Sequence, residues 1–241
     1  MFRHRGKNRT LLHNIQLASL LSFVAGIVNV TGFFAIAALT TNVTGHFAFF
    51  AEEVVRQDWL MAWNYLLYIL AFFLGAFVSN LFVELFMRRD IGLTNIIPVL
   101  TEIVILVSVG LLTYYDRMTN ADLIACSLLF SMGLQNALVT MISNAAVRTT
   151  HLTGLFTDLG IEFSQLFFFR KEEQVHKLKA SIKLRLVIIS FFFLGCILGG
   201  YTFSELGTLN LLGAAACLVG GLIYSGVKVR LMRLGRTLIG H

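Results

Sequence analysis

The chain has 241 residues, of which 57% are hydrophobic and only 13% are charged, and it contains a single proline. This composition is far more apolar than that of an ordinary soluble domain, so it predicts an integral membrane protein. The formal net charge of +6 does not indicate a nucleic-acid partner, because the basic residues flank apolar runs and do not gather on one soluble face.

Metal, redox and enzymatic chemistry find little support in the residue pattern. The three cysteines, Cys126, Cys196 and Cys217, lie inside apolar runs without CxxC or His/Cys spacing, so neither a disulfide framework nor a zinc site is indicated. The chain also shows no Ser/His/Asp order, HExxH, P-loop or GxGxxG motif. We therefore expect no metal, no cofactor and no enzymatic activity.

Six apolar stretches are long enough to cross a bilayer, since a helical span takes roughly 20 residues. They cover about 16–39, 60–86, 95–115, 122–146, 184–205 and 208–227. Two shorter and more polar segments, at about 44–57 and 153–169, are predicted to be half-helices that re-enter the membrane or lie along it. The expected fold is an all-α membrane protein with about six transmembrane helices and two half-helices in a single domain, residues 1–241.

The distribution of basic residues predicts the orientation. With a cytoplasmic N-terminus and six spans, 17 basic residues fall inside and only Arg56 and Arg117 fall outside, as the positive-inside rule expects. If the two short segments also cross, eight spans result, with 16 basic residues inside and three outside. We favour six spans, with both termini cytoplasmic, because the short segments are short and carry carboxylates.

One polar phrase occurs twice, as Thr40-Thr41-Asn42-Val43-Thr44-Gly45 and, 109 residues later, as Thr149-Thr150-His151-Leu152-Thr153-Gly154. Similar elements flank both copies: Gly26-Ile27-Val28-Asn29 and Gly133-Leu134-Gln135-Asn136 upstream, Phe72-Phe73-Leu74-Gly75 and Phe192-Phe193-Leu194-Gly195 downstream. This order predicts two repeat halves, approximately 11–116 and 121–230. Three crossings per half would invert the second copy, as in many secondary transporters, whereas four would leave the repeat parallel.

The two polar phrases are the predicted solute site. Thr44 and Thr153 stand where helix N-caps belong, so each half-helix would begin with free amide protons and the positive end of its dipole, which attracts anions or carbonyl oxygens. Polar groups here need protein, water or ligand partners inside a bilayer. We predict solute contacts from Asn29, Thr40, Thr41, Asn42, Thr44, Gly45, Asn136, Thr149, Thr150, His151, Thr153 and Gly154. The alternatives are that the threonines only cap helices and that the two asparagines only bond across helices.

Titratable side chains near these phrases are candidates for coupling transport to protons. An intramembrane carboxylate costs roughly 2.5–3.5 kcal/mol to insert, so it usually faces an aqueous cavity, pairs, or relays a proton. The candidates are Asp158 and Glu162, which share one face of the second half-helix, with Glu53, His46 and the deeply placed Glu102. Solvated anchoring at the membrane interface, or for Glu102 a structural hydrogen bond, is the alternative. The basic stretch from Arg170 to Arg185 is expected to be a solvated loop that contacts anionic headgroups.

The chain resembles the YoaK family of bacterial inner-membrane proteins, which has no established activity. The likeness covers nearly the whole chain and lies in Gly26-x-x-Asn29, Thr44-Gly45, Gly133-x-x-Asn136 and Thr149-Thr150-x-x-Thr153-Gly154, followed by Asp158. The resemblance implies a multi-pass protein of the bacterial inner membrane. It implies no particular chemistry.

The functional expectation therefore rests on the repeat and its polar turns. We expect a secondary transporter of a small polar solute, anions included, with proton coupling through residues such as Asp158 or Glu162. The alternatives are a channel or passive facilitator that uses the same half-helices, and a non-transporting membrane interaction protein. The expected partners are the lipid bilayer and an unidentified solute, with no nucleic acid, and homo-oligomerisation stays open.

Overall fold

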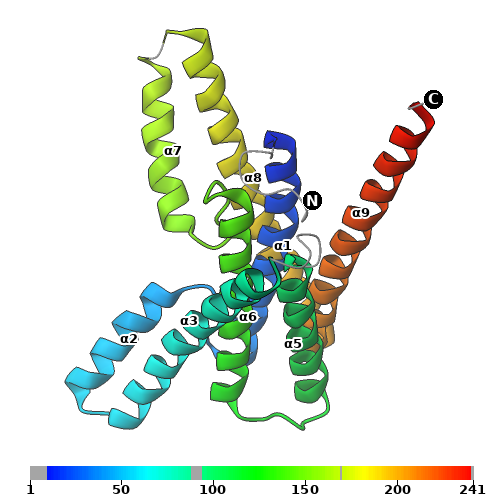
Figure 1. Ribbon diagram of the computed structural model, residues 1–241. Helices are drawn as coiled ribbons and strands as arrows, with labels where there is room; N and C mark the ends of the chain where they lie inside the picture. The colour runs from blue at the N-terminus through cyan, green and yellow to red at the C-terminus, as the bar shows by residue number, and fades with distance from the viewer. Residues whose placement is uncertain (1–9, 88–93, 169, 240–241) are drawn as a thin grey trace.

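The structure is a computed structural model that describes residues 10–87, 94–168 and 170–239, with the side chains of the last helix described as far as residue 226. All regular structure in this part of the chain is helical, so the predicted all-α class is confirmed (Figure 1). The elements are α1 (Leu11–Ile36), α2 (Val43–Arg56), α3 (Trp59–Met87), α5 (Ile96–Tyr114), α6 (Ala121–Ser143), α7 (Leu152–Leu166), α8 (Glu172–Leu206), the 3-10 turn η2 (Gly207–Leu209) and α9 (Asn210–Ile239).

Five stretches of the described chain are long and apolar enough to cross a membrane, judged by length and composition. They are α1, α3, α5, α6 and a stretch from Glu172 to Gly226 that runs from α8 through η2 into α9. The predicted basic segments before Thr10 and at Arg88-Arg89 lie outside the described residues. The helices and their composition give a multi-spanning membrane protein.

The end of the first span differs from the predicted position. We expected it to continue to about residue 39, but α1 ends at Ile36 because Ala37 adopts the left-handed conformation, with a φ of 54°. The amide of Ala37 bonds back to the carbonyl groups of Gly32 and Phe33, which closes the last turn. The polar phrase that follows is therefore free to turn away from the axis of α1.

The predicted solvated loop between Arg170 and Arg185 is wrong, because α8 already begins at Glu172. Glu172 and Glu173 lie in its first turn, where carboxylates interact favourably with the helix dipole. Lys177 then pairs with Glu173 at 2.6 Å, one helical turn apart. The same segment buries apolar side chains against α7, namely Leu178 and Ile182 against Leu159. The stretch is thus an amphipathic helix that packs its apolar side chains against α7 and keeps the Glu173–Lys177 pair exposed.

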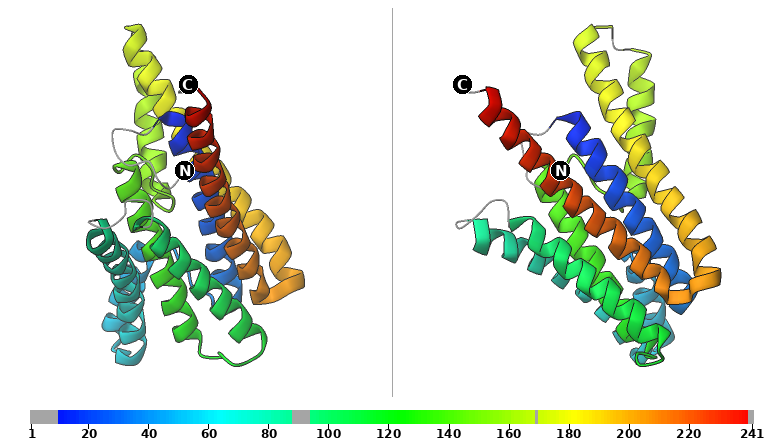
Figure 2. Two further views of the ribbon diagram at one scale, coloured as in Figure 1. Left: turned by 45° about the vertical axis from the view of Figure 1, so that its right-hand side comes forward. Right: turned by 90° about the vertical axis from the view of Figure 1, so that its right-hand side faces the viewer.

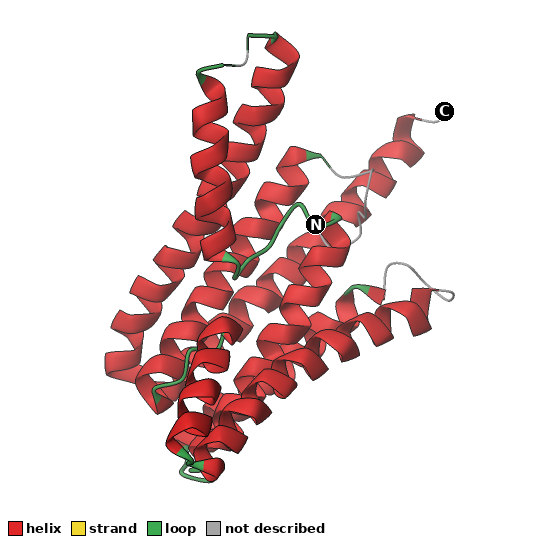
Figure 3. Ribbon diagram, turned by 90° about the vertical axis from the view of Figure 1, so that its left-hand side faces the viewer, coloured by secondary structure: helices red, strands yellow, loops and turns green. Residues whose placement is uncertain are grey.

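Two helical hairpins project from the centre of the molecule toward opposite ends. One is formed by α2 and α3 and the other by α7 and α8 (Figure 1). The helices α1 and α6 lie between them and run in opposite directions, and the start of α1 and the end of α9 lie at the same end of the molecule (Figure 2). Figure 3 shows the described turns between the helices as loops, in green.

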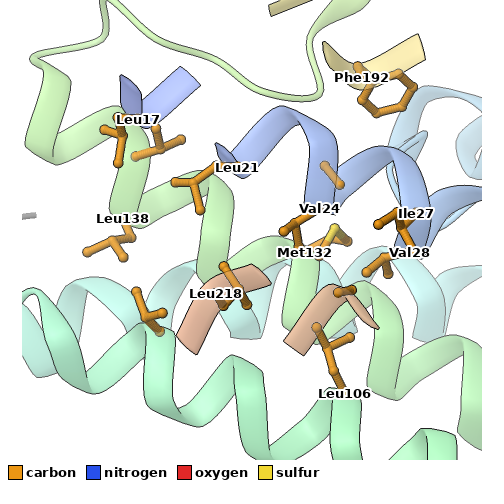
Figure 4. Packing of buried hydrophobic residues seen from close by; sticks show 14 of the residues in the cluster. Leu17, Leu21, Val24, Ile27, Val28, Leu106, Met132, Leu138, Phe192 and Leu218 are labelled. Atoms are coloured by element: carbon orange, nitrogen blue, oxygen red, sulfur yellow. The ribbon is translucent and has the colours of Figure 1, made fainter. Parts of the chain in front are cut away.

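The main apolar core joins α1, α5, α6, α8 and α9 (Figure 4). Its fully buried side chains include Leu21, Val28, Leu106, Met132 and Leu218. In lipid there is little hydrophobic gain from moving an apolar side chain between bilayer and protein, so close packing has to stabilise such a bundle. The core therefore depends on how near the helix backbones approach.

The helices α1 and α8 cross at a pair of glycines. A Cβ atom on Gly26 would overlap the carbonyl oxygen of Phe192, and a Cβ on Gly195 would overlap the carbonyl oxygen of Phe23. Only glycine leaves room for two backbones at this distance. Each glycine thus packs against the main chain of the other helix.

The helices α3 and α6 cross in the same way. A Cβ on Gly75 would overlap the carbonyl oxygen of Phe130, and a Cβ on Gly133 would overlap that of Phe72. The phenylalanine-glycine elements that the sequence shows twice therefore lie at two matching contacts. Each contact joins a helix from before residue 116 to a helix from after residue 121.

Substitution of a crossing glycine is predicted to loosen the bundle. In Gly133→Ala the new methyl group meets main chain, which cannot rotate aside, so we expect a loss of about 1–3 kcal/mol, typical of overpacked sites. The measurement is thermal unfolding of the purified protein in detergent.

Gly213→Ala is the matched control, because a Cβ at Gly213 meets no atom within 4 Å. It should leave the melting temperature almost unchanged. Equal melting temperatures for Gly133→Ala and Gly213→Ala would contradict the close backbone contact.

Candidate functional site

The turn between α1 and α2 is held by Asn29. The Oδ1 atom of this α1 residue accepts hydrogen bonds from the amide of Thr41 at 3.2 Å and from the Thr41 hydroxyl at 2.9 Å. Thr40 beside it is fully buried. One carboxamide therefore supplies partners for a stretch of chain that has left the helix, as an apolar environment demands.

The turn between α6 and α7 repeats this arrangement with Asn136. Its Oδ1 atom accepts from the Thr150 hydroxyl at 2.9 Å and from the Thr149 hydroxyl at 3.3 Å. Gln135 adds a second link, since its Nε2 donates to Thr149 Oγ1 at 3.3 Å and to the carbonyl of Leu21 on α1 at 3.0 Å. Asn29 and Asn136, which stand at matching positions in the sequence, thus each hold one turn by hydrogen bonds.

The predicted N-caps are wrong by two residues in both half-helices. The N-cap of α2 is Asn42, whose Oδ1 accepts from the amide of Gly45 at 3.1 Å, so Thr44 falls inside the first turn. The N-cap of α7 is His151, and Thr153 falls inside the first turn. Among the described residues His151 makes no side-chain cap bond. The amides that begin α7 are therefore less satisfied than those that begin α2.

The two turns line one common cavity of about 370 Å³. The helices α2 and α7 begin close together at the middle of the molecule and run toward opposite ends (Figure 1). The cavity lining mixes hydroxyl, amide and imidazole groups with a few apolar side chains: Thr41, Asn42, Val43, Thr44, Phe72, Thr150, His151, Leu152 and Thr153. Residues from both polar phrases thus face the same space, although more than 100 residues separate them in the chain.

A second, smaller cavity of about 190 Å³ adjoins the beginning of α7. Its lining is Ala145, Ala146, Arg148, His151, Gly154, Leu155, Asp158 and Arg185. Because His151 lines both cavities, this side chain lies between the shared space of the two turns and a more highly charged space beside α8.

The two carboxylates of α7 form ion pairs with α8. Arg185 reaches Asp158 Oδ2 through its NH1 atom and Glu162 Oε2 through its Nε atom, both at 3.0 Å. Ser181 donates a further hydrogen bond to Glu162 Oε1 at 2.6 Å. Both carboxylates were predicted as coupling candidates, whereas Arg185 was expected only as a basic residue of a solvated loop.

A signal for Arg185 was present in the repeat. The glycines of the two crossings, Gly75 and Gly195, are 120 residues apart, and this offset relates Arg185 to Tyr65 on α3. Tyr65 packs against α2. If the two hairpins are alike, its counterpart Arg185 is expected to face α7. The repeat thus relates Arg185 to a position that faces the neighbouring short helix, once the packing of Tyr65 is known.

The coupling candidates in the first hairpin lie elsewhere. His46 is buried, bonds to the carbonyl of Leu39 at 2.9 Å through Nε2, and packs its ring against Tyr65 and Tyr68. Glu53 lies 3.7 Å from Arg56 on the same helix. Neither residue lines the cavity between the turns. The first hairpin is thus held mainly by an aromatic cluster.

Glu102 lies in α5 and is 1% exposed. Among the described residues neither of its carboxylate oxygens has a hydrogen-bond partner. A buried carboxyl group without a partner is costly in its ionised form. The structure thus buries Glu102 within the helix bundle, and this residue does not line the shared cavity.

The geometry defines a multi-spanning helical membrane protein with a polar cavity between two helix-breaking turns. Its sequence places it in a known family: the chain belongs to the family described as protein of unknown function (DUF1275), which matches residues 17–224. It is 25% identical over 177 residues to the UPF0700 transmembrane protein YoaK of Bacillus subtilis (strain 168), with 73% of this chain and 78% of that protein covered. The predicted resemblance to the YoaK family is confirmed. No solved structure matches the chain.

Removal of the Asn136 carboxamide is predicted to free the second turn. In Asn136→Ala the hydroxyls of Thr149 and Thr150 lose their acceptor, so amides of residues 145–151 should exchange with solvent faster, with a stability cost of about 1–3 kcal/mol. The measurement is hydrogen exchange followed by mass spectrometry.

Ser127→Ala serves as the control on the same helix, because the Ser127 hydroxyl bonds only within α6, to Leu123 at 2.8 Å. Exchange in residues 37–42 should stay unchanged in both variants. Unchanged exchange of residues 145–151 in Asn136→Ala would show that the asparagine does not hold this turn.

Proposed function

We propose that this protein is a secondary transporter of a small polar solute, which binds between the two turns. The observation that carries the proposal is the cavity of about 370 Å³ lined by residues of both polar phrases. Clefts of this size with a few placed polar groups commonly hold small ligands. The hydroxyl, amide and imidazole groups around it suit a polar solute, and no polymer or large cofactor is required.

The chain is proposed to be an inverted repeat, and the contacts support this. The Asn29 and Asn136 bonds to Thr41 and Thr150 match, and so do the two glycine crossings. Both crossings join a helix of one half to a helix of the other. The two hairpins point to opposite ends of the molecule, as inversion requires (Figure 1). Two similar halves of this kind can rock about a site between them.

Six spans are the proposed count. The helices α8 and α9 are separated by η2, where Gly207 has a φ of 53°, and the chain reverses its direction there (Figure 2). If α8 and α9 are counted as two spans, the five stretches found by length and composition become six. The helices α2 and α7 have 14 and 15 residues, fewer than a span needs. The proposed location is the bacterial inner membrane, with both termini cytoplasmic.

Proton coupling is proposed to run through the carboxylates. Asp158 and Glu162 pair with Arg185 next to the solute cavity, which supports them over Glu53, whose partner Arg56 lies on the outer part of α2. His46 and Glu102 are both buried in the first half of the chain and do not line the solute cavity, so they would act at a distance. Intramembrane ionisable residues commonly serve such roles.

A channel built on the same half-helices is the second candidate, and a non-transporting membrane interaction protein is the third. The shared cavity favours a site that binds over a surface that only docks other helices. Enzymatic activity is not proposed. Besides the bilayer and the solute no partner is proposed, and association of several copies stays open.

Transport is predicted to depend on the hydroxyls of Thr44 and Thr153. Valine has nearly the shape of threonine but cannot donate or accept, so Thr44→Val and Thr153→Val should each lower uptake by roughly two- to tenfold, as expected for one lost hydrogen bond. The measurement is uptake from a library of labelled polar solutes into liposomes that contain the purified protein.

Thr157→Val is the matched control on α7, since that hydroxyl bonds to the carbonyl of Thr153 at 3.0 Å and does not line the cavity. It should transport at the normal rate. If no solute enters the liposomes through the unmodified protein, or if all three variants behave alike, the proposed site is wrong.

The proposed inversion predicts on which side of the membrane the segment after Arg89 lies. A topology reporter fused after Arg89, outside the described residues, should be found in the cytoplasm if the chain makes six crossings. A reporter on the outer side would instead mean eight crossings and a parallel repeat. Fusion at Arg117, which the six-span arrangement places outside, provides the matching control.

A further inference from the structure

Three groups that favour negative charge meet in the smaller cavity beside α7. Arg185 and Arg148 both line it, and Arg148 has no ion-pair partner among the described residues. Gly154 brings the beginning of α7 to the same space, and this helix start lacks a side-chain cap in the described structure. The start of a helix carries a partial positive charge. The cavity thus combines two guanidinium groups with a helix dipole.

The carboxylates of α7 differ in how they use Arg185. Glu162 is 12% exposed and has two partners, the Nε atom of Arg185 and the hydroxyl of Ser181. Asp158 is 48% exposed and has one, the NH1 atom of Arg185. The Arg185–Glu162 pair is therefore complete without Asp158. Asp158 is the second carboxylate on a single cation, and Arg148 is a further cation that lines the same cavity.

We propose that the cavity beside α7 is a site for a small monovalent anion such as a carboxylate, that Arg185 and Arg148 bind the anion, and that Asp158 occupies Arg185 while the site is empty. The cavity volume of about 190 Å³ is roughly half that of the shared cavity, which favours a small anion. This inference adds an anion site beside the proposed solute cavity, and its link to transport rests on the proposed function.

The charge balance gives the site a proton requirement. With Asp158 ionised the cavity already holds one carboxylate for Arg148, and an incoming anion would add a second. The anion therefore takes the place of Asp158 on Arg185, and Asp158 takes up a proton. The charged and titratable groups facing Asp158 are Arg185 from α8, Arg148 and His151 from the preceding turn, and Glu162 from its own helix. In the described part of the chain α8 is the helix that α7 contacts most, and Leu155 of α7 also belongs to the main apolar core.

The first hairpin does not repeat this site. The repeat offsets relate Asp158 to Phe49 on α2 and Arg185 to Tyr65 on α3. The rings of Phe49 and Tyr65 stack on each other with centroids 5.3 Å apart, so an aromatic contact fills the place of the ion pair. The anion site therefore lies on one side of the shared cavity, and His151 lines both the anion site and the shared cavity.

The test is calorimetric binding of formate to the purified protein in a neutral detergent, between pH 5.5 and 7.5 at constant ionic strength. Formate stays ionised over this range. Uptake of one proton with each anion should make the affinity rise as the pH falls, by up to about tenfold per pH unit, the limit for one linked proton. Asp158→Asn should bind formate more tightly than the unmodified protein at pH 7.5 and without this pH dependence.

Arg185→Gln should lose formate binding, and Arg185→Lys should retain part of it, which separates loss of the site from loss of the fold. Lys177→Gln, which removes an exposed ion pair elsewhere on α8, should bind normally. The proposal is overturned if Asp158→Asn binds formate no better than the unmodified protein, or if the affinity ignores pH. It is also overturned if phosphatidylglycerol added to the micelles binds through Arg185 while formate does not, because the site would then serve a lipid headgroup.

These outcomes are independent of the transport assay. If formate binds with the expected pH dependence but the liposomes take up nothing, the anion site stands and the transporter proposal fails. If uptake depends on Thr44 and Thr153 while formate does not bind, the transporter proposal stands and the anion site fails.

Discussion

Backbone that leaves a helix inside an apolar environment must find new partners for its amide and carbonyl groups, and this constraint governs the centre of the protein. Asn29 and Asn136 meet it at two places by accepting from the threonines of the adjoining turns. Each asparagine sits on a long helix two turns before that helix ends, so it reaches back across the bend. These hydrogen bonds stabilise the two breaks between helices, and the polar cavity lies between the breaks.

The turns face each other because the long helices that carry them are fixed by main-chain contacts. The crossings at Gly26 and Gly195 and at Gly75 and Gly133 leave no room for a side chain. Each crossing joins one helix from each half of the chain. The two halves therefore interlock, and neither half contains both helices of a crossing. This interlocking brings residues 41–44 and 150–153 to one cavity.

The sequence allowed the helices and the polar turns to be predicted, because long apolar runs and a twice-repeated phrase are properties of neighbouring residues. The predictions were wrong at exact helix boundaries and where the outcome depends on a distant contact. The N-caps lie at Asn42 and His151 instead of Thr44 and Thr153, so both helices begin two residues earlier than expected; Asn42 caps the amide of Gly45, whereas His151 makes no side-chain cap bond in the described structure. The stretch after Arg170 became helix because α7 covers its apolar face. Arg185 was missed because its partners lie on another helix, 23 and 27 residues before it.

The functional account rests on the nearness of the two turns, and cross-linking tests it most directly. Cysteines replacing Thr44 and Thr153, in a chain from which Cys126, Cys196 and Cys217 have been removed, line the same cavity and should be joined by a short bifunctional thiol reagent. A cysteine replacing Ser164, eleven residues or about 16 Å further along α7, should not be joined to the one at Thr44. Mass spectrometry of the linked peptides in native membranes gives the answer. Efficient linkage of the first pair alone is the predicted result, and linkage of neither pair, or of both equally, would contradict a common cavity between the turns.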